Sequence, residues 1–361
     1  MKNRMIFTLK ALLVLLIAVV AGCTKVDKGF LSPYVQYASD FTVIRGRVGK
    51  SYSLVTDGSS LPIKVKLLHI YNEAGEIVDD VFKKAYPVEI WTERYDPLVD
   101  KSYAAIKAKQ KTVDLPPITV NESNGTIESN AGTLYLPLGT YSLDLEVSNE
   151  AGSEVVQKII KLKLVDGDPV EITPQTGSFS ASLLVAGTAS GAGTLFNGNN
   201  NPFVQYSITR TADTPNVFVL RVEDRNGVVF SPAKGEIAKR PNSGLNPNPP
   251  FLQNLEDYAP DTFTALDTAM VLRYPLVPFP LQSLGNGYNM YYRLPARFVR
   301  IDNTSTWSAN AAGNFYKGTA DPHYVGIYPD NAYDYAIRIP MRIFVPGSYR
   351  LVVRLLNTTH R

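Results

Sequence analysis

Side chains that usually carry out catalysis are scarce in this sequence. It contains three histidines, His69, His323 and His360, and a single cysteine, Cys23. These are too few for a thiol–histidine nucleophile or a zinc cluster of the usual composition. The Gly-x-Ser-x-Gly, phosphate-loop and EF-hand patterns are absent as well. Carboxylate neighbours such as Glu256, Asp257 and Asp261 occur in any chain of this length. We therefore expect no catalytic residue, no metal site and no cofactor.

Aromatic side chains are a better lead, because sugars present C–H faces that stack on tryptophan and tyrosine rings. One aromatic group surrounds Trp91, in a turn with Arg94, Tyr95 and Asp96 that ends at Pro97. A second group starts in an Asn- and Tyr-rich stretch and continues through polar sequence. Its predicted ligand-binding residues are Tyr288, Tyr291, Tyr292, Trp307, Tyr316 and Tyr324. The alternative is that these rings pack in the cores and corners of β-sandwich domains.

The start of the chain has the pattern of a lipoprotein leader. A basic segment with Lys2, Arg4 and Lys10 precedes an apolar run over residues 11–20, which is short for a transmembrane helix. Val20-Ala21-Gly22-Cys23 resembles a bacterial lipobox. This resemblance implies cleavage of residues 1–22, acylation of Cys23 and a tether over residues 23–33. An ordinary secretory signal with an incidental cysteine is the alternative. Because Cys23 is the only cysteine, no intrachain disulfide is possible.

Length and charge limit the remaining classes of function. The chain has 361 residues and a formal net charge of +3, part of which lies in the leader. A mature chain of this length suits about two domains. No stripe of basic residues in the sequence suggests nucleic-acid binding.

Alternating apolar and polar residues predict a mainly β protein with two β-sandwich domains. The stretch from Leu138 to Val147 combines Gly139, Tyr141 and strict alternation, and residues 155–164 form its return strand. This hairpin resembles the closing strands of immunoglobulin-like domains, with Tyr141 as a tyrosine corner. Residues 346–355 repeat the pattern, with glycine and tyrosine at the same spacing. We therefore predict an immunoglobulin-like domain over residues 34–166 and a second β-rich sandwich with long loops over 169–361.

Other segments are placed around these strands. Ile63–Leu67 is predicted to be a half-buried strand, and residues 288–300 and 333–344 a pair of strands. Residues 103–111 are rich in alanine and lysine and predict one short helix, interpreted as a crossover within the first domain.

The lipobox, the tether, an immunoglobulin-like first domain and a Tyr/Asn-rich second domain together resemble Bacteroidota outer-membrane lipoproteins of polysaccharide-utilisation systems. The segments that carry a closer likeness to a lipoprotein family of unknown function are residues 29–37, 121–128 and 137–141. The resemblance implies an outer-membrane setting beside a TonB-dependent porin and its glycan-capturing lipoprotein partner. We therefore predict a non-catalytic, lipid-anchored accessory protein that binds glycan, or the outer-membrane uptake complex, through its second domain. Lys25, Asp27 and Lys28 leave open which face of the membrane it occupies. A structural or adhesion lipoprotein that binds other envelope proteins is the main alternative, and a glycoside hydrolase is a further one.

Overall fold

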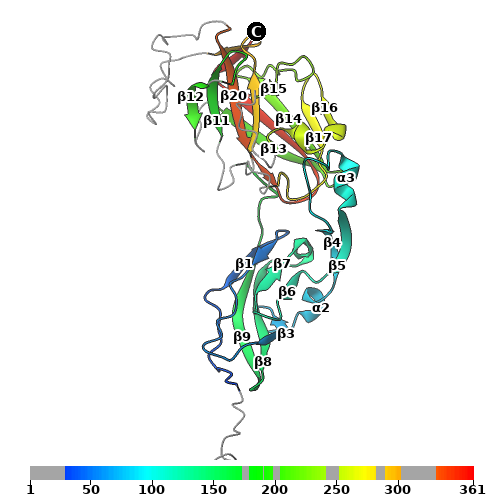
Figure 1. Ribbon diagram of the computed structural model, residues 1–361, viewed down its shortest axis with the longest axis vertical. Helices are drawn as coiled ribbons and strands as arrows, with labels where there is room; N and C mark the ends of the chain where they lie inside the picture. Colours follow the sequence, from blue (N-terminus) through cyan, green and yellow to red (C-terminus); the bar gives the residue numbers. More distant parts are fainter. Residues whose placement is uncertain are drawn as a thin grey trace, which may run out of the picture. The chain divides into compact units, whose positions relative to one another are not determined.

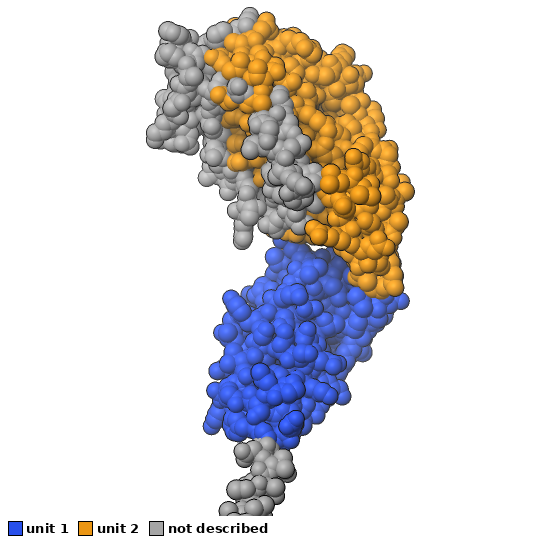
Figure 2. Space-filling view, viewed as in Figure 1, with its two compact units in different colours: residues 1–88, 114–166 blue, residues 89–113, 167–361 orange. Residues whose placement is uncertain are grey.

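The structure is a computed structural model, and it describes residues 29–172, 179–189, 191–197, 204–240, 252–281, 289–301 and 331–361 (Figure 1). Its strands and helices form two compact units, coloured separately in Figure 2. Unit 1 contains residues up to Val88 and Asp114–Asp166, and unit 2 contains Glu89–Val113 and Gly167–Arg361. The chain is mainly β, as the alternation predicted.

Unit 1 is a sandwich of a four-stranded and a three-stranded sheet. The larger sheet has the strand order β1 (Phe41–Ile44), β9 (Gly152–Val165), β8 (Gly139–Asn149) and β3 (Lys64–Tyr71). The smaller sheet has the order β2 (Gly49–Lys50), β7 (Ile127–Ser129) and β6 (Ile118–Val120). The helical turns α2 (Asp79–Phe82) and η1 (Ala131–Tyr135) connect strands. β4 (Tyr86–Trp91) and β5 (Gln110–Leu115) form a separate two-stranded ribbon, of which residues 86–88 and 114–115 are assigned to unit 1 and the rest to unit 2.

The core of unit 1 follows from the period-2 pattern of β8. Leu143, Leu145 and Val147 are fully buried, as alternate residues on one face of a strand should be. Tyr141 begins this row, and its hydroxyl donates to the carbonyl of Pro137 at 2.7 Å. This bond to backbone four residues upstream is the predicted tyrosine corner of an immunoglobulin-like sandwich.

The described residues of unit 2 form two five-stranded sheets and two short ribbons. The first sheet has the order β12 (Gly191–Asn197), β11 (Ser180–Val185), β20 (Tyr333–Pro340), β18 (Asn289–Leu294) and β15 (Ala238–Lys239). The second has the order β13 (Val204–Ala212), β22 (Ser348–Leu355), β14 (Val217–Asp224), β17 (Met270–Arg273) and β16 (Phe263–Ala265). The ribbons are β10 (Val170–Glu171) with β21 (Arg342–Ile343), and β19 (Val299–Ile301) with β23 (Thr358–His360). Helical segments are α4 (Leu255–Tyr258) and η2 (Pro260–Thr262).

The predicted repeat is present at the start of β22. The hydroxyl of Tyr349 donates to the carbonyl of Val345 at 2.8 Å, again four residues upstream. Gly347 has a φ of +149°, and a Cβ atom there would lie 2.8 Å from the carbonyl oxygen of Ala212. Any other residue would therefore force the backbones apart. The sheets around the two repeats differ, because β22 pairs antiparallel with β13 and parallel with β14, whereas both neighbours of β8 are antiparallel.

Several predicted segments appear close to where the pattern placed them. β18 and β20 pair antiparallel, as expected of the strands predicted at 288–300 and 333–344. Both are shorter than predicted, because β18 ends at Leu294 and β20 at Pro340, and the separate strands β19 and β21 follow them. The strand expected at Ile63–Leu67 is β3, which runs further to Tyr71 through a bulge between Leu67 and His69. Within the described residues, no helix is both long and apolar enough to cross a membrane.

The short helix is present as α3 (Tyr103–Ala108), but its place differs from the prediction. It ends three residues early, and Gln110 already starts β5. Ile106 is fully buried in the hydrophobic core of unit 2, and the backbone N–H of Tyr103 donates to Asp261 Oδ1 at 2.8 Å. Residues 89–113 therefore pack as part of the second unit, whereas the sequence analysis placed them inside the first domain.

The end of the predicted tether is also packed against unit 1. Ser32 is buried, its backbone N–H donates to Ser59 Oγ at 2.9 Å, and its hydroxyl donates to Asp57 Oδ2 at 2.7 Å. The predicted tether over residues 23–33 is therefore too long, because Ser32 already packs against unit 1. Residues 1–28, which hold the predicted leader and Cys23, lie outside the described residues.

Candidate functional site

Four of the predicted ligand-binding aromatics lie outside the described residues: Tyr288, Trp307, Tyr316 and Tyr324. Tyr292 is described, and it is only 1% exposed. Its hydroxyl accepts from the backbone N–H of Leu255 at 2.7 Å and donates to Glu256 Oε2 at 2.9 Å. Burial raises the pKa of this hydroxyl well above its ordinary value. Tyr292 is therefore a core residue that holds α4 in place, which corrects its prediction as a ligand-stacking ring.

Tyr291 and Trp91 keep some surface. Tyr291 is half-buried, and the guanidinium of Arg240 lies 5.9 Å from its ring centroid. Trp91 ends β4 with 38% of its surface exposed, and its ring lies 6.1 Å from that of the buried Tyr95. Neither ring lines a described hollow of unit 2. Their role as ligand-binding residues remains a prediction.

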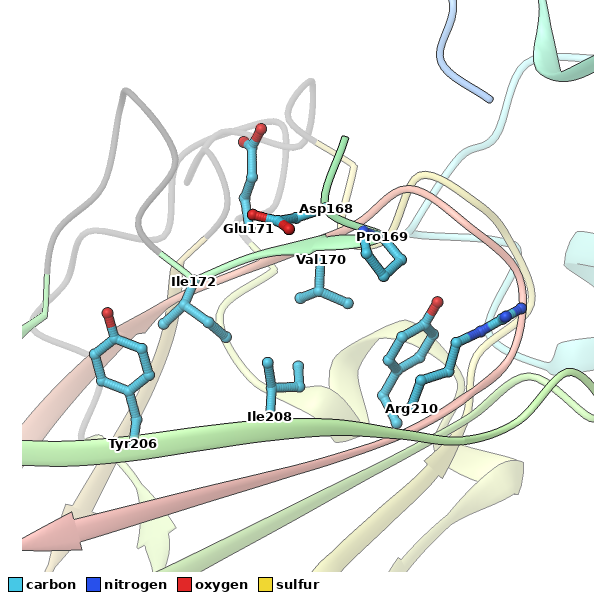
Figure 3. A pocket seen from close by; sticks show the side chains of 9 residues that line it. Asp168, Pro169, Val170, Glu171, Ile172, Tyr206, Ile208 and Arg210 are labelled. Carbon is cyan, nitrogen blue, oxygen red and sulfur yellow. The ribbon is translucent and has the colours of Figure 1, made fainter. Parts of the chain in front are cut away.

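A hollow of about 510 Å³ lies in unit 2 between residues 168–172 and the edge strand β13 (Figure 3). Among the described residues, β13 is the terminal strand of its sheet, and the hollow lies against the face that presents Tyr206, Ile208 and Arg210. The residues that line the hollow are Asp168, Pro169, Val170, Glu171, Ile172, Tyr206, Ile208, Arg210 and Tyr349. Its volume falls within the range of small-molecule pockets, about 300–1,000 Å³.

The middle of this hollow is apolar. Figure 3 shows Val170 and Ile172 pointing from their segment toward β13, with Ile208 pointing back at them. The ring of Tyr206 stands beside them on the same strand face, because residues 206 and 208 are two apart. It stacks on Phe179 with a centroid distance of 4.8 Å and an interplanar angle of 21°. With 41% of its surface exposed, Tyr206 offers a held aromatic face to a ligand.

Charged groups surround this apolar middle. Asp168 and Glu171 stand at the rim, where Figure 3 shows Glu171 pointing from its segment away from β13, and Arg210 contributes a guanidinium at the end of the hollow opposite Tyr206. Arg210 is fixed in position, since Nη2 donates to the carbonyl of Pro346 at 2.6 Å and Nη1 lies 2.8 Å from Asp213 Oδ1. Its guanidinium carbon lies 6.0 Å from the ring centroid of Tyr349. Burial raises the pKa of the Tyr349 hydroxyl, and the charge of Arg210 partly offsets this effect.

The arrangement can hold a polar ring by stacking and by hydrogen bonds. An aromatic face and an apolar floor with few charged groups around them are typical of sugar and small-molecule sites. Within the described residues, His, Cys, Asp and Glu side chains form no group of three or more that could hold a metal ion. The sequence analysis missed Tyr206 and interpreted residues 166–169 as a break between domains. Tyr206 alternates with polar residues in β13, as Val204 and Ile208 do. This alternation was the sequence pattern that could have placed Tyr206 on the same strand face as Ile208.

No family model matches the chain, and no curated protein matches it. Among solved structures, it is similar to a SusE-like, surface-located polysaccharide-binding protein from the heparin utilisation locus of Bacteroides thetaiotaomicron. The TM-score is 0.24 and the sequence identity is 7%, over 90% of this chain and 54% of that one. The chain thus spans about half the length of that protein. A TM-score this low does not establish a common fold.

Proposed function

We propose that this chain is a non-catalytic, glycan-binding accessory protein of the cell envelope. Cys23 would carry the lipid anchor in the outer membrane, and unit 2 would bind the sugar. The observation that carries the proposal is the exposed ring of Tyr206, held by Phe179 at the side of the 510 Å³ hollow. A sugar ring that stacks there would lie over the apolar floor of Val170, Ile172 and Ile208, and a longer glycan would extend along β13 toward Arg210. A TonB-dependent porin is the partner that the lipoprotein resemblance implies.

A second function, binding to other envelope proteins, is favoured by the surface of unit 1. Among the described residues of unit 1, eight large apolar or aromatic side chains are more than half exposed: Phe30, Tyr34, Val48, Tyr52, Leu61, Ile77, Tyr135 and Val155. Scattered exposed apolar residues are ordinary, but grouped ones mark interaction sites. Phe30 and Leu61 are close in space, because the carbonyls of Phe30 and Ser60 both accept from Asn149 Nδ2. Recovery of one stable envelope partner by affinity purification, with no sugar binding, would support this second function.

Replacing Tyr206 with alanine is expected to weaken glycan binding about three- to tenfold, because an aromatic contact contributes ~0.5–1.5 kcal/mol beyond area burial. Affinity electrophoresis of residues 24–361 through plant and host polysaccharides measures this change. Tyr52→Ala is the matched control, since Tyr52 is 68% exposed and lies in unit 1. Tyr206→Phe should bind like the original chain.

Equal retardation of the original chain and Tyr206→Ala by every glycan would remove the hollow as the binding site. The same gels can be followed by an assay for released reducing ends. A glycan that binds and stays intact supports a non-catalytic role. Release of reducing ends that Glu171→Gln abolishes would instead assign a glycoside hydrolase, which needs two positioned carboxyl groups.

A further inference from the structure

The outward face of the second sheet of unit 2 carries four arginines, which follow one another at regular steps along the strand direction. Arg350 and Arg354 lie on β22. Arg221 on β14 pairs with Val352, the β22 residue midway between them. Arg273 on β17 pairs with Val217 of β14, and Val217 pairs in turn with Ser348 of β22. Successive members are therefore two residues apart along the strands, about 6.6 Å per step and ~20 Å in total. We call Arg273, Arg350, Arg221 and Arg354 the arginine row.

All members of the row point away from the core. The alternate residues Leu272, Leu220 and Leu351 are fully buried, so their neighbours on the same strands face outward. A groove of about 520 Å³ lies along the row. Its floor is apolar, and its lining residues are Val219, Val271, Val352, Leu266, Ala269, Thr268, Arg221, Arg350 and Glu223.

Positive charge exceeds negative charge along this groove. Glu223 is the carboxylate in its lining, and it accepts from Arg221 Nε at 2.6 Å and from Arg354 Nη2 at 2.7 Å. Burial acts to raise the pKa of Glu223, but the hydrogen bonds from these two arginines lower it below its ordinary value. Glu223 thus stays ionised near neutral pH and fixes both side chains while leaving their other N–H donors available.

The remaining two arginines differ in their surroundings. Arg273 lies over the ring of Tyr103, with its guanidinium carbon 4.5 Å from the centroid. Arg350 is exposed, and within the part of the chain that the structure describes its side chain has neither a hydrogen-bond nor an ion-pair partner. An arginine fork matches carboxylate and sulfate oxygens in geometry and charge.

We propose that this groove binds a linear anionic polysaccharide laid along the arginine row. Acidic groups of the polymer would pair with Arg350 and with the available N–H donors of Arg221 and Arg354. Uncharged sugar faces would lie on the valine floor of the groove. The choice of a polysaccharide rests on the proposed function, whereas the anionic character rests on the arginine row alone. The groove is a second binding site, which shares no lining residue with the hollow beside Tyr206.

The test is affinity electrophoresis of residues 24–361, which retain both units, through dextran sulfate, polygalacturonate and neutral dextran. We expect retardation by one or both anionic polymers and none by dextran, with the effect falling as salt is raised. Retardation by one polymer alone identifies sulfate or carboxylate as the recognised group. Arg350→Glu should raise the apparent dissociation constant at least tenfold. Lys163→Glu also replaces a positive side chain with a negative one, on the exposed face of β9 in unit 1. It should leave the apparent dissociation constant within about twofold of that of the original chain.

Absence of retardation by both anionic polymers would overturn the proposal, as would equal retardation of Arg350→Glu and the original chain. A loss of the same size in Lys163→Glu would also overturn it, because net charge rather than this groove would then control binding. Tyr206→Ala separates the two proposals. It should keep anionic binding while binding the glycan of the hollow about three- to tenfold more weakly. If the arginine row binds no anionic polymer and Tyr206→Ala still weakens binding of a neutral glycan, the proposed function stands by itself.

Discussion

Replacing Asp334 with alanine is expected to lower the free energy of unfolding of unit 2 by about 3–5 kcal/mol, the usual effect of breaking a buried ion pair. The Asp334 side chain is 2% exposed, and its Oδ2 pairs with Nη1 of Arg293, which is 20% exposed. Its oxygens also accept from the backbone N–H groups of Gly187 at 3.0 Å and Ala296 at 2.8 Å. Alanine would leave one partly buried cation and two N–H donors without this acceptor. Asp334→Asn keeps an acceptor oxygen and should cost less.

Urea unfolding followed by tryptophan emission measures this effect. Trp91 lies in unit 2, with its ring 6.1 Å from that of the buried Tyr95, so its emission reports on that unit. Asp213→Ala is the control, because Asp213 is 86% exposed in its ion pair with Arg210 and should change stability by less than ~1 kcal/mol. Equal unfolding midpoints for Asp334→Ala and Asp213→Ala would contradict the prediction.

The closing strands of both units were predictable because their signal is local. Gly139 and Tyr141 stand two residues apart, as do Gly347 and Tyr349, and each tyrosine bonds a carbonyl only four residues upstream. The alternation that follows places every second residue of β8 and β22 in a core. Short-range chemistry of this kind does not depend on which other strands lie beside it.

The binding residues were less predictable, because they depend on which strand face is covered. Tyr291 and Tyr292 are adjacent in β18, so they point to opposite faces of the sheet. At most one of them can face a ligand in a given hollow. The sequence does not say which of them lies inward, and the structure buries Tyr292. Tyr206 offers the opposite case, since its exposure follows from the place of β13 at a sheet edge.

Long-range register had no signal in the sequence. The arginine row is assembled from β17, β14 and β22, and Glu223 and Arg354 are 131 residues apart. Similarly, the composition of α3 predicted a helix, but Asp261, which accepts from its first residue, lies 158 residues later. Such pairings arise from tertiary packing of strands whose local patterns are nearly alike. A single sequence therefore predicts the strands but not the surfaces they form together.

Replacing Cys23 with serine is expected to move the protein from the membrane fraction to the soluble fraction. Each buried CH₂ of an acyl chain contributes ~0.8 kcal/mol, one chain binds only marginally, and several chains give lasting attachment. The sequence holds no second cysteine that could accept a lipid in its place. The effect on membrane attachment should thus be nearly complete.

The measurement is fractionation of cells of a Bacteroidota host, combined with the mass of the mature N-terminal peptide. The original chain should yield an acylated peptide beginning at Cys23, and the serine variant should yield none. Tyr52→Ala, produced in the same way, should stay in the membrane fraction. If the serine variant also stays there after a high-salt wash, attachment comes from an uncleaved leader or from a protein partner. The exposed Phe30, Tyr34 and Leu61 of unit 1 would then be the first residues to replace, because apolar contacts resist salt where ion pairs do not.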